Sequence, residues 1–150
     1  MRKASVNIYK IKGVKENVVD YMQKDIMTAK DAAEIFKAFL PSNLEEYFLL
    51  ICLNAAGVPV GIHEVAHGDL TCCPVHPREV FKRALINNAN SIIIAHNHPS
   101  GNNAPSTEDI VLTNRLAAAG KIMGIKVLDH IIITDDSYYS LRSNNHFEEE

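Results

Sequence analysis

Short apolar segments of two kinds alternate along this sequence. Some are continuous or alternating runs rich in β-branched and aromatic residues, such as 46–54 (EYFLLICLN), and these are typical of strands. Others repeat apolar residues every three or four positions behind a capping residue, which is typical of helices. The pattern predicts strands at residues 5–12, 46–54, 58–65, 91–95, 125–134 and 138–141, and helices at 28–40, 77–88 and 106–119. Strands with intervening helices indicate an α/β layer fold.

Single residues mark the ends of several predicted elements. Thr28 begins the first helix and Pro41 ends it, while Pro77 suits the first turn of the second helix. Gly120 is a natural stop, so the third helix is expected to end near residue 119. The second helix is expected to bury an apolar stripe that consists of Val80, Phe81, Ala84 and Leu85.

Composition limits both the fold and the function. The chain has 150 residues, 47% of them hydrophobic, which is enough apolar material for one globular domain with a single core. A net charge of -3 and the acidic end 148–150 argue against direct nucleic-acid binding, which needs clustered Lys and Arg. The start has no apolar signal core and no segment is as long as a membrane span, so we expect a cytoplasmic protein without membrane contact.

The cysteines predict no disulfide framework. Cys52, Cys72 and Cys73 are odd in number, and adjacent cysteines rarely pair, so we expect reduced thiols. One region suggests a second metal site through the side chains of His63, His67, Cys72, Cys73 and His76. Its spacing fits no standard zinc motif, so Cys72 and Cys73 are better interpreted as small packing residues or exposed thiols.

The most specific chemistry lies in residues 91–116 (SIIIAHNHPSGNNAPSTEDIVLTNRL). Residues i and i+2 of a strand point to the same side, so His96 and His98 would project together where the chain leaves the sheet. A turn-rich loop then leads into a helix, and Asp109 in its first turn can fold back toward both imidazoles. Two nitrogens and one oxygen leave a fourth tetrahedral position for water, as expected of one catalytic zinc per chain.

Three neighbouring residues have alternative interpretations. Ser106 is a good N-cap and Asp109 stands three residues later, so this pair also resembles a capping arrangement that satisfies helix amides. Asp129 and His130 lie in a predicted buried strand and could supply a fourth ligand, a support for the ligands or a structural hydrogen-bonded pair. We favour the support, because three ligands and water already complete the site.

These motifs resemble a known family. His96-x-His98-Pro-Ser-Gly followed by Ser106-x-x-Asp109 is similar to the zinc signature of the JAMM-type, or JAB, metalloproteases in their bacterial RadC form. The stretches 76–85 and 127–133 also resemble the RadC pattern, and the likeness extends over about residues 45–141. It implies a JAB/MPN domain, with a mixed sheet, helices on both faces and an architecture like that of cytidine deaminases.

The resemblance also implies catalytic roles. In JAMM-type enzymes a glutamate on an early strand acts as the general base, and Glu46 matches that position, with Glu45 as its competitor after a one-residue slip. Ser106 would donate a hydrogen bond to the developing oxyanion. The expected function is zinc-dependent hydrolysis of a peptide or isopeptide amide in a peptide, a protein or a small amide substrate.

Two other functions stay open at this point. One is a DNA repair or DNA-associated accessory role, as the RadC name suggests, and the other is a metal-bound, inactive interaction module. Many RadC proteins carry a helix-hairpin-helix module, and the first third of this chain has no counterpart of it. We expect an N-terminal extension packed on the domain at 1–43, the catalytic domain at 44–142 and an acidic tail at 143–150, with residues from 142 frayed.

Overall fold

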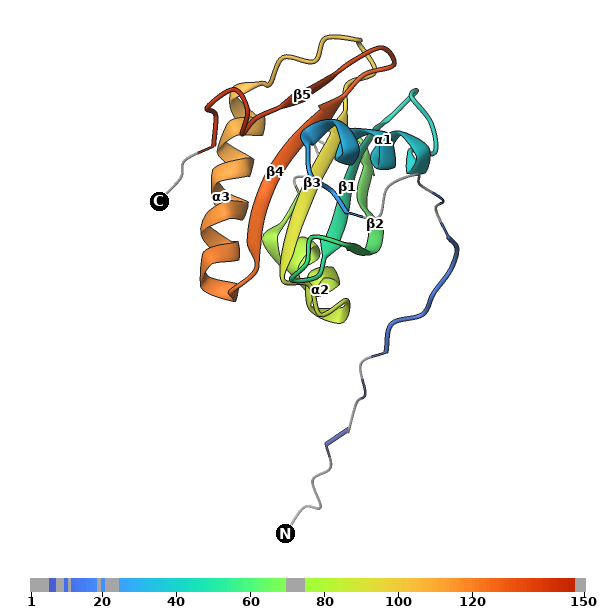
Figure 1. Ribbon diagram of the computed structural model, residues 1–150, viewed down its shortest axis with the longest axis vertical. Helices are drawn as coiled ribbons and strands as arrows, with labels where there is room; N and C mark the ends of the chain where they lie inside the picture. The colour runs from blue at the N-terminus through green and yellow to red at the C-terminus, as the bar shows by residue number, and fades with distance from the viewer. Residues whose placement is uncertain are drawn as a thin grey trace.

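The structure is a computed structural model that describes residues 6–7, 10, 12–18, 20, 25–69 and 75–147 (Figure 1). Its elements in chain order are α1 (Ala29–Phe39), β1 (Glu46–Leu53), β2 (Pro59–Gly68), α2 (Pro77–Ile86), β3 (Ser91–Asn97), α3 (Thr107–Met123), β4 (Lys126–Ile133) and β5 (Tyr138–Ser140). Within the described part of the chain, no helix is both long and apolar enough to cross a membrane. The predicted strand 5–12 is largely outside the described residues, and those of its residues that are described form no strand.

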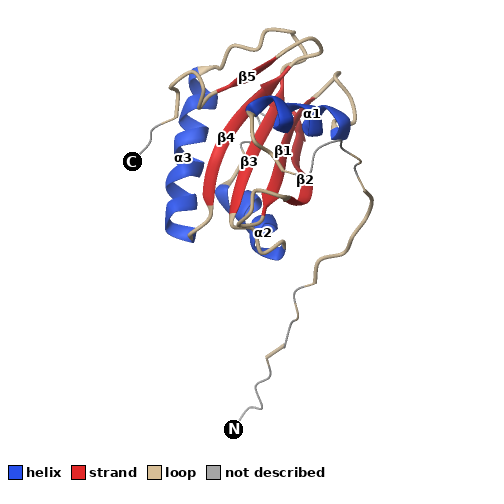
Figure 2. Cartoon of the chain, in the orientation of Figure 1, coloured by secondary structure: helices blue, strands red, loops and turns tan. Residues whose placement is uncertain are grey.

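The strands form one mixed sheet in the order β2-β1-β3-β4-β5 (Figure 2). β1 pairs with β2 and with β3 in antiparallel fashion, and β5 pairs antiparallel with β4. β3 and β4 are parallel, so the chain must cross over between them, and α3 makes this crossover. The end of β3 and the start of α3 therefore meet at one edge of the sheet.

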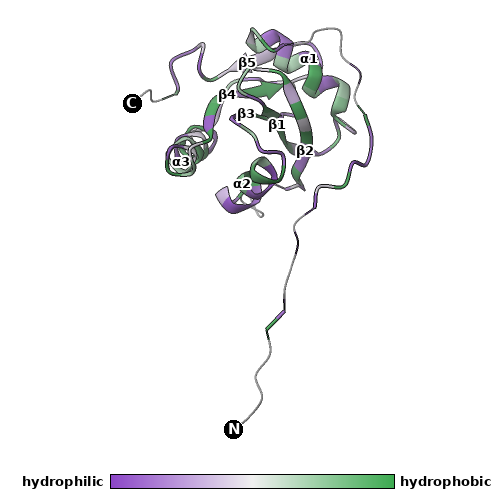
Figure 3. Ribbon diagram, turned by 60° about the horizontal axis from the view of Figure 1, so that its bottom comes forward, coloured by the Kyte–Doolittle hydropathy of each residue, from purple (hydrophilic) through white to green (hydrophobic). Residues whose placement is uncertain are grey.

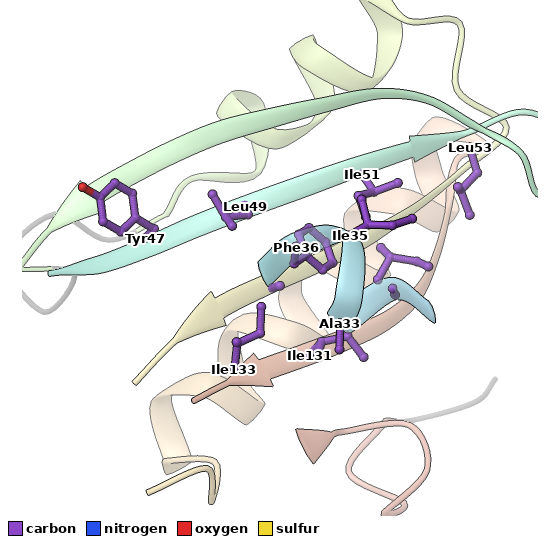
Figure 4. Packing of buried hydrophobic residues seen from close by; sticks show 12 residues of the cluster. Ala33, Ile35, Phe36, Tyr47, Leu49, Ile51, Leu53, Ile131 and Ile133 are labelled. Atoms are coloured by element: carbon purple, nitrogen blue, oxygen red, sulfur yellow. The ribbon is translucent and has the colours of Figure 1, made fainter. Parts of the chain in front are cut away.

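Helices cover both faces of the sheet, as the family resemblance implied. Figure 3 shows α1 on one side and α2 and α3 on the other. Alternate residues of β1 point to opposite faces, so Leu49 and Ile51 join the cluster under α1, while Phe48 and Leu50 join the cluster under α2 and α3. Figure 4 shows the first cluster, to which α1 contributes Phe36. The confirmed fold class is α/β with a central sheet between two helical layers.

The predicted end of the third helix was wrong. Helix α3 continues through Gly120 and ends at Met123, where Gly124 adopts the left-handed conformation with φ 68°. Gly120 serves close packing instead, because a Cβ there would lie 2.5 Å from the carbonyl oxygen of Ile125 and 3.2 Å from the Phe81 ring. Two glycines four residues apart thus have different tasks, and only the second terminates the helix.

Two expectations about exposure were also wrong. Leu85 is 50% exposed, since it follows the buried Ala84 by one residue and so lies about 100° further round α2, away from the sheet. The chain from Arg142 to Phe147 is not frayed. The backbone N–H of Arg142 donates to Asp129 Oδ1 (3.1 Å), and Phe147 packs against the cluster under α2 and α3.

The packing of Gly120 generates a first prediction. Gly120→Ala should lower the free energy of unfolding by about 2–3 kcal/mol, because the methyl group displaces the Ile125 carbonyl or the helix. This loss should exceed the gain of about 1 kcal/mol in helix propensity. Urea unfolding followed by circular dichroism measures it. Gly13→Ala is the control, because its φ is not left-handed and the new Cβ would make only an ordinary 3.4 Å contact with Ile86, and a Gly120→Ala protein as stable as wild type would contradict the packing argument.

Candidate metal centre

Strand β3 delivers two histidines to the same face of the sheet. His96 is 3% exposed and lies on the face that carries Ile92 and Ile94, and His98 follows two residues later, directly after the strand. The His96 ring stacks on Phe48 of β1, with 6.3 Å between ring centroids and 7° between the planes. The backbone N–H of His98 donates to the Ile133 carbonyl (2.9 Å), which keeps the chain attached to β4 after β3 has ended.

The first turn of α3 brings Asp109 to these histidines. Ser106 caps the helix: its Oγ accepts from the Asp109 N–H (3.1 Å), and its own N–H donates to Asp109 Oδ2 (2.8 Å). This reciprocal capping box satisfies two helix amides and also fixes the direction of the Asp109 carboxylate. Asp109 Oδ1 then lies 3.2 Å from His96 Nε2, and Oδ2 lies 3.6 Å from His98 Nε2.

His96, His98 and Asp109 therefore form a group that could hold a metal ion. Each offers one ligand atom, and these atoms all lie within 4.8 Å of one another. The two Nε2 atoms are 2.8 Å apart. This group is the only one of its kind within the ranges 25–69 and 75–147 and the other described residues.

The outer nitrogen of each histidine determines what the inner nitrogen offers. His98 Nδ1 lies 2.7 Å from the Asn102 carbonyl oxygen, which can only accept, so Nδ1 carries the proton. In the neutral ring the proton-free atom is Nε2, which faces His96 and Asp109. His98 therefore directs a lone pair at the centre of the group.

A chain of buried hydrogen bonds through Thr113 and His130, called the His130 relay below, likewise determines which nitrogen of His96 carries the proton. The single hydroxyl proton of Thr113 is donated to the Asp109 carbonyl (2.6 Å), so Thr113 Oγ1 accepts from His130 Nδ1 (2.6 Å). His130 Nε2 is then an acceptor for the Nδ1–H of His96 (2.8 Å). The directions of these bonds leave the Nε2 lone pair of His96 free, pointing at His98 and Asp109.

The donor set fits a divalent metal such as zinc. Two imidazole lone pairs and a carboxylate face one another across less than 5 Å, an arrangement that is repulsive until a cation lies between them. Two nitrogens and one oxygen suit Zn²⁺, which accepts His and Asp ligands in catalytic sites with an open fourth position. The hydrogen bonds on the outer nitrogens fix each ring in its ligating tautomer.

Without a metal, protons compete for the same Nε2 atoms. Hydrogen bonding of the protonated ring to Asp109 then raises the pKa of His98. Burial raises the pKa of Asp109, but hydrogen bonds from His96 and His98 outweigh burial and hold that pKa well below its usual range. Burial depresses the pKa of His130 far below the usual histidine value, so this ring is neutral, as the relay requires. The site therefore keeps its carboxylate ionised.

The two candidate bases occupy different positions. Glu46 is the first residue of β1, half-buried, and alternation places its side chain on the same face as Phe48 and therefore as His96, the residue opposite Phe48. Its carboxylate is close enough to raise the pKa of His98. Glu45 is exposed and precedes the strand. Glu46 thus lies on the strand face that carries His96, whereas Glu45 lies outside the strand.

The structure separates Asp129 from His130. His130 contacts the ligand His96, whereas Asp129 accepts from the Ser140 hydroxyl (2.5 Å) and from the Arg142 N–H (3.1 Å). Burial raises the pKa of Asp129. Asp129 also accepts from the backbone N–H of His130 (2.7 Å), so its contact with the relay is through the main chain. Its carboxylate mainly holds the C-terminal segment against β4 and β5.

The other histidines have local partners. His63 Nε2 contacts the Asn87 amide (2.6 Å), His67 Nδ1 contacts Glu64 (2.5 Å), and His76 caps α2. Cys72 and Cys73 lie outside the described residues. Cys52 is a free, buried thiol whose pKa burial raises to about 12.

Two residues of the site were not singled out from the sequence. Thr113 stands four residues after Asp109, hence on the same face of α3, and this spacing is a signal that could have revealed it. Asn97 lies between the ligand histidines with its side chain 2% exposed. A buried amide in that position is visible only once the register of β1 and β3 is known.

Removal of a ligand should abolish metal binding. Purified wild-type protein supplied with Zn²⁺ should hold near one ion per chain, and His96→Ala or His98→Ala should hold none, because two remaining ligands bind Zn²⁺ weakly. Elemental analysis after dialysis measures the content. His63→Ala is the matched control and should keep the ion. Equal zinc in wild type and both ligand variants would rule out this site.

Interruption of the relay should weaken metal binding without unfolding the protein. Thr113→Val keeps the side-chain volume but cannot accept from His130, so we expect a loss of about 10–100-fold in zinc affinity. Thr113→Ser restores the hydroxyl and should recover most of the affinity. Competition with a chromogenic chelator measures both. Valine and serine variants of equal affinity would show that the hydroxyl has no part in the site.

Comparison with known proteins agrees with this architecture. The family model described as "RadC-like JAB domain" matches residues 16–146. UPF0758 proteins are similar: that of Alkaliphilus metalliredigens is 48% identical over 101 residues, which are 67% of this chain and 44% of the relative. The UPF0758 protein of Clostridium tetani is 43% identical over 121 residues, which are 81% of this chain and 53% of the relative. That of Staphylococcus haemolyticus is 39% identical over 130 residues, which are 86% of this chain and 57% of the relative. The chain thus spans about half the length of these relatives. With a match over most of its length, the chain belongs to the family of RadC-like JAB domains.

Proposed function

We propose that this domain is a zinc-dependent hydrolase that cleaves a peptide or isopeptide amide bond. The observation that carries the proposal is the convergence of three inward-facing ligands, on His96, His98 and Asp109, with a carboxylate, Glu46, on the same face of the sheet. A metal ligand set with a nearby base is what water activation requires. An inactive module would need only the ligands.

His96, His98 and Asp109 would hold the ion. When bound, zinc lowers the pKa of a coordinated water to about 7 and polarises a substrate carbonyl. The chain itself supplies the orientation: the capping box holds Asp109, and the Asn102 carbonyl and the His130 relay hold the two rings. These supports keep the ligands in place before substrate arrives.

Glu46 is assigned the general base. Its carboxylate accepts a proton from the attacking water and later delivers that proton to the leaving amine. Its half-buried position on the strand face that carries His96 suits this exchange, because a base must be within hydrogen-bond reach of the proton that it removes.

Ser106 is assigned the oxyanion donor. The helix cap uses its Oγ as an acceptor, so the hydroxyl proton remains free for substrate. A donor of this kind lowers the barrier by about 2.7–4 kcal/mol in other enzymes. The same residue would then serve the helix and the reaction through opposite ends of one O–H bond.

Substrate is proposed to approach along a depression beside Glu46. This depression of about 350 Å³ is lined by Leu44, Glu45, Glu46, Gly68, Asp69 and Pro99. Leu44 is 89% exposed and offers apolar contact to an extended peptide or a small amide. Nucleic acid and membrane are not proposed as partners, given the net charge of -3. A cytoplasmic location remains the expectation drawn from the sequence.

Replacement of the base should separate metal binding from turnover. Glu46→Gln keeps the shape of the side chain but cannot take the proton, so hydrolysis should fall by at least about 100-fold while zinc stays bound. Release of aminomethylcoumarin from a panel of peptidyl and lysine-Nε-linked isopeptidyl substrates measures turnover, and elemental analysis measures zinc.

The matched control is Glu45→Gln, which removes the same charge one residue earlier and should keep near wild-type turnover. Undiminished turnover in Glu46→Gln would refute the mechanism. Zinc-loaded wild type without turnover on any substrate of the panel would favour the interaction module.

A further inference from the structure

Asn97, between the two ligand histidines, makes a contact that neither histidine makes. Its side-chain Oδ1 accepts from the backbone N–H of Tyr47 (2.7 Å), and its Nδ2 donates to the backbone carbonyl of Glu45 (2.8 Å). Tyr47 and Glu45 are the neighbours of Glu46 on either side. One buried amide thus holds the main chain before and after the proposed base.

We infer that Asn97 is a positioning residue that fixes the place of Glu46 relative to the metal ligands. This inference rests on the proposed function, because it assigns Asn97 a task in the reaction of that same site. Asn97 is not assigned contact with substrate or metal. Its side chain acts on Glu46 through the backbone.

The two hydrogen bonds of the Asn97 side chain form what we call the clamp. The register of the sheet explains why Glu46 needs it. The paired residues of β1 and β3 end at Phe48 and His96, so Glu46 lies beyond the last pair. Glu46 pairs with Gly68 of β2 on its other side, so only its β3 side lacks cross-strand pairing, and a strand end held on one side frays more readily than one held on both. The Asn97 amide supplies the two missing bonds from its side chain and continues the link between the strands for one more step.

The chemistry of the contact suits asparagine. The clamp needs an acceptor and a donor on one rigid group, and the planar amide carries both. An aspartate could accept from Tyr47 but would place a second acceptor against the Glu45 carbonyl. An alanine would make neither bond and would leave two backbone groups unsatisfied in a site where Asn97 is only 2% exposed.

The clamp connects the base to the ligands by the shortest route along the chain. His96 and His98 adjoin Asn97 in sequence, and His98 is itself held to β4 through the Ile133 carbonyl (2.9 Å). A shift of β1 relative to β3 would therefore move Glu46 away from the metal while the ligands stayed in place. A displacement of about 1 Å can reduce a reaction rate by about 100-fold.

The test compares Asn97→Ala with Asn54→Ala. Asn54 Oδ1 accepts from the N–H groups of Ala56 (2.9 Å) and Val58 (3.0 Å) at the far end of β1, so its loss removes two similar bonds away from the site. Zinc content, kcat and KM are measured with the peptidyl coumarin substrates. Asn97→Asp is the second variant, to be used if Asn97→Ala does not fold. It keeps the bond from the Tyr47 N–H and loses only the donor to the Glu45 carbonyl.

A spectroscopic readout makes the test independent of turnover. Protein labelled with [5-¹³C]glutamate is loaded with Co²⁺ or with Zn²⁺, and the Glu46 carboxyl signal is assigned by its absence in Glu46→Gln. The paramagnetic displacement of this signal by Co²⁺ reports the position of the carboxylate relative to the metal. Asn97→Ala should shrink and broaden the displacement, whereas Asn54→Ala should leave it as in wild type.

The expected result for turnover is a fall in kcat of about 10–100-fold in Asn97→Ala, with KM and zinc content unchanged. In the Glu46→Gln background the same substitution should cause no further loss, since there is no base left to position. An undisturbed Glu46 signal in both Asn97 variants would overturn the inference. The proposed function fails by other outcomes: undiminished turnover in Glu46→Gln, or no turnover in wild type. In either case the cobalt experiment still decides the role of Asn97.

Discussion

Four acceptor atoms that face one another set the constraint on which this domain is built. The Nε2 atoms of His96 and His98 and both carboxylate oxygens of Asp109 converge without a hydrogen between the imidazoles. Such a cluster is unfavourable in isolation and becomes favourable around a cation. The protein supports it by occupying the opposite side of each ligand: a carbonyl for His98, a second imidazole for His96 and a helix amide for Asp109.

The mixed sheet makes this arrangement achievable with few residues. The parallel pair β3 and β4 requires a crossover helix, and that helix returns its N-terminus to the edge where β3 ends. The same pairing puts His130 of β4 beside His96 of β3. The antiparallel neighbour β1 runs in the reverse direction, so its first residue, Glu46, starts where β3 finishes. The proposed ligands, their support and the proposed base thus meet at one edge of the sheet.

The sequence predicted more of the ligands than of their supports. His96 and His98 were readable because strand alternation is local, and Asp109 because a helix cap brings it back toward the strand. Glu46 needed the family resemblance, since only register distinguishes it from Glu45. Thr113 had only its four-residue spacing from Asp109 as a signal, since its partner His130 lies 17 residues away, and Asn97 had none, since its partner Tyr47 lies 50 residues away. The prediction at Gly120 was wrong for a related reason. Glycine in a local pattern indicates a helix end, whereas this glycine allows close contact with β4.

The capping box of α3 joins folding and ion binding in one pair of residues. Its Ser106–Asp109 contacts begin the helix, and the same carboxylate faces the histidines. Unwinding of this first turn would release a ligand and a cap together. By thermodynamic linkage, an ion bound by Asp109 stabilises the start of α3 through its free energy of binding. Metal depletion should therefore first increase the rate of amide hydrogen exchange in that turn.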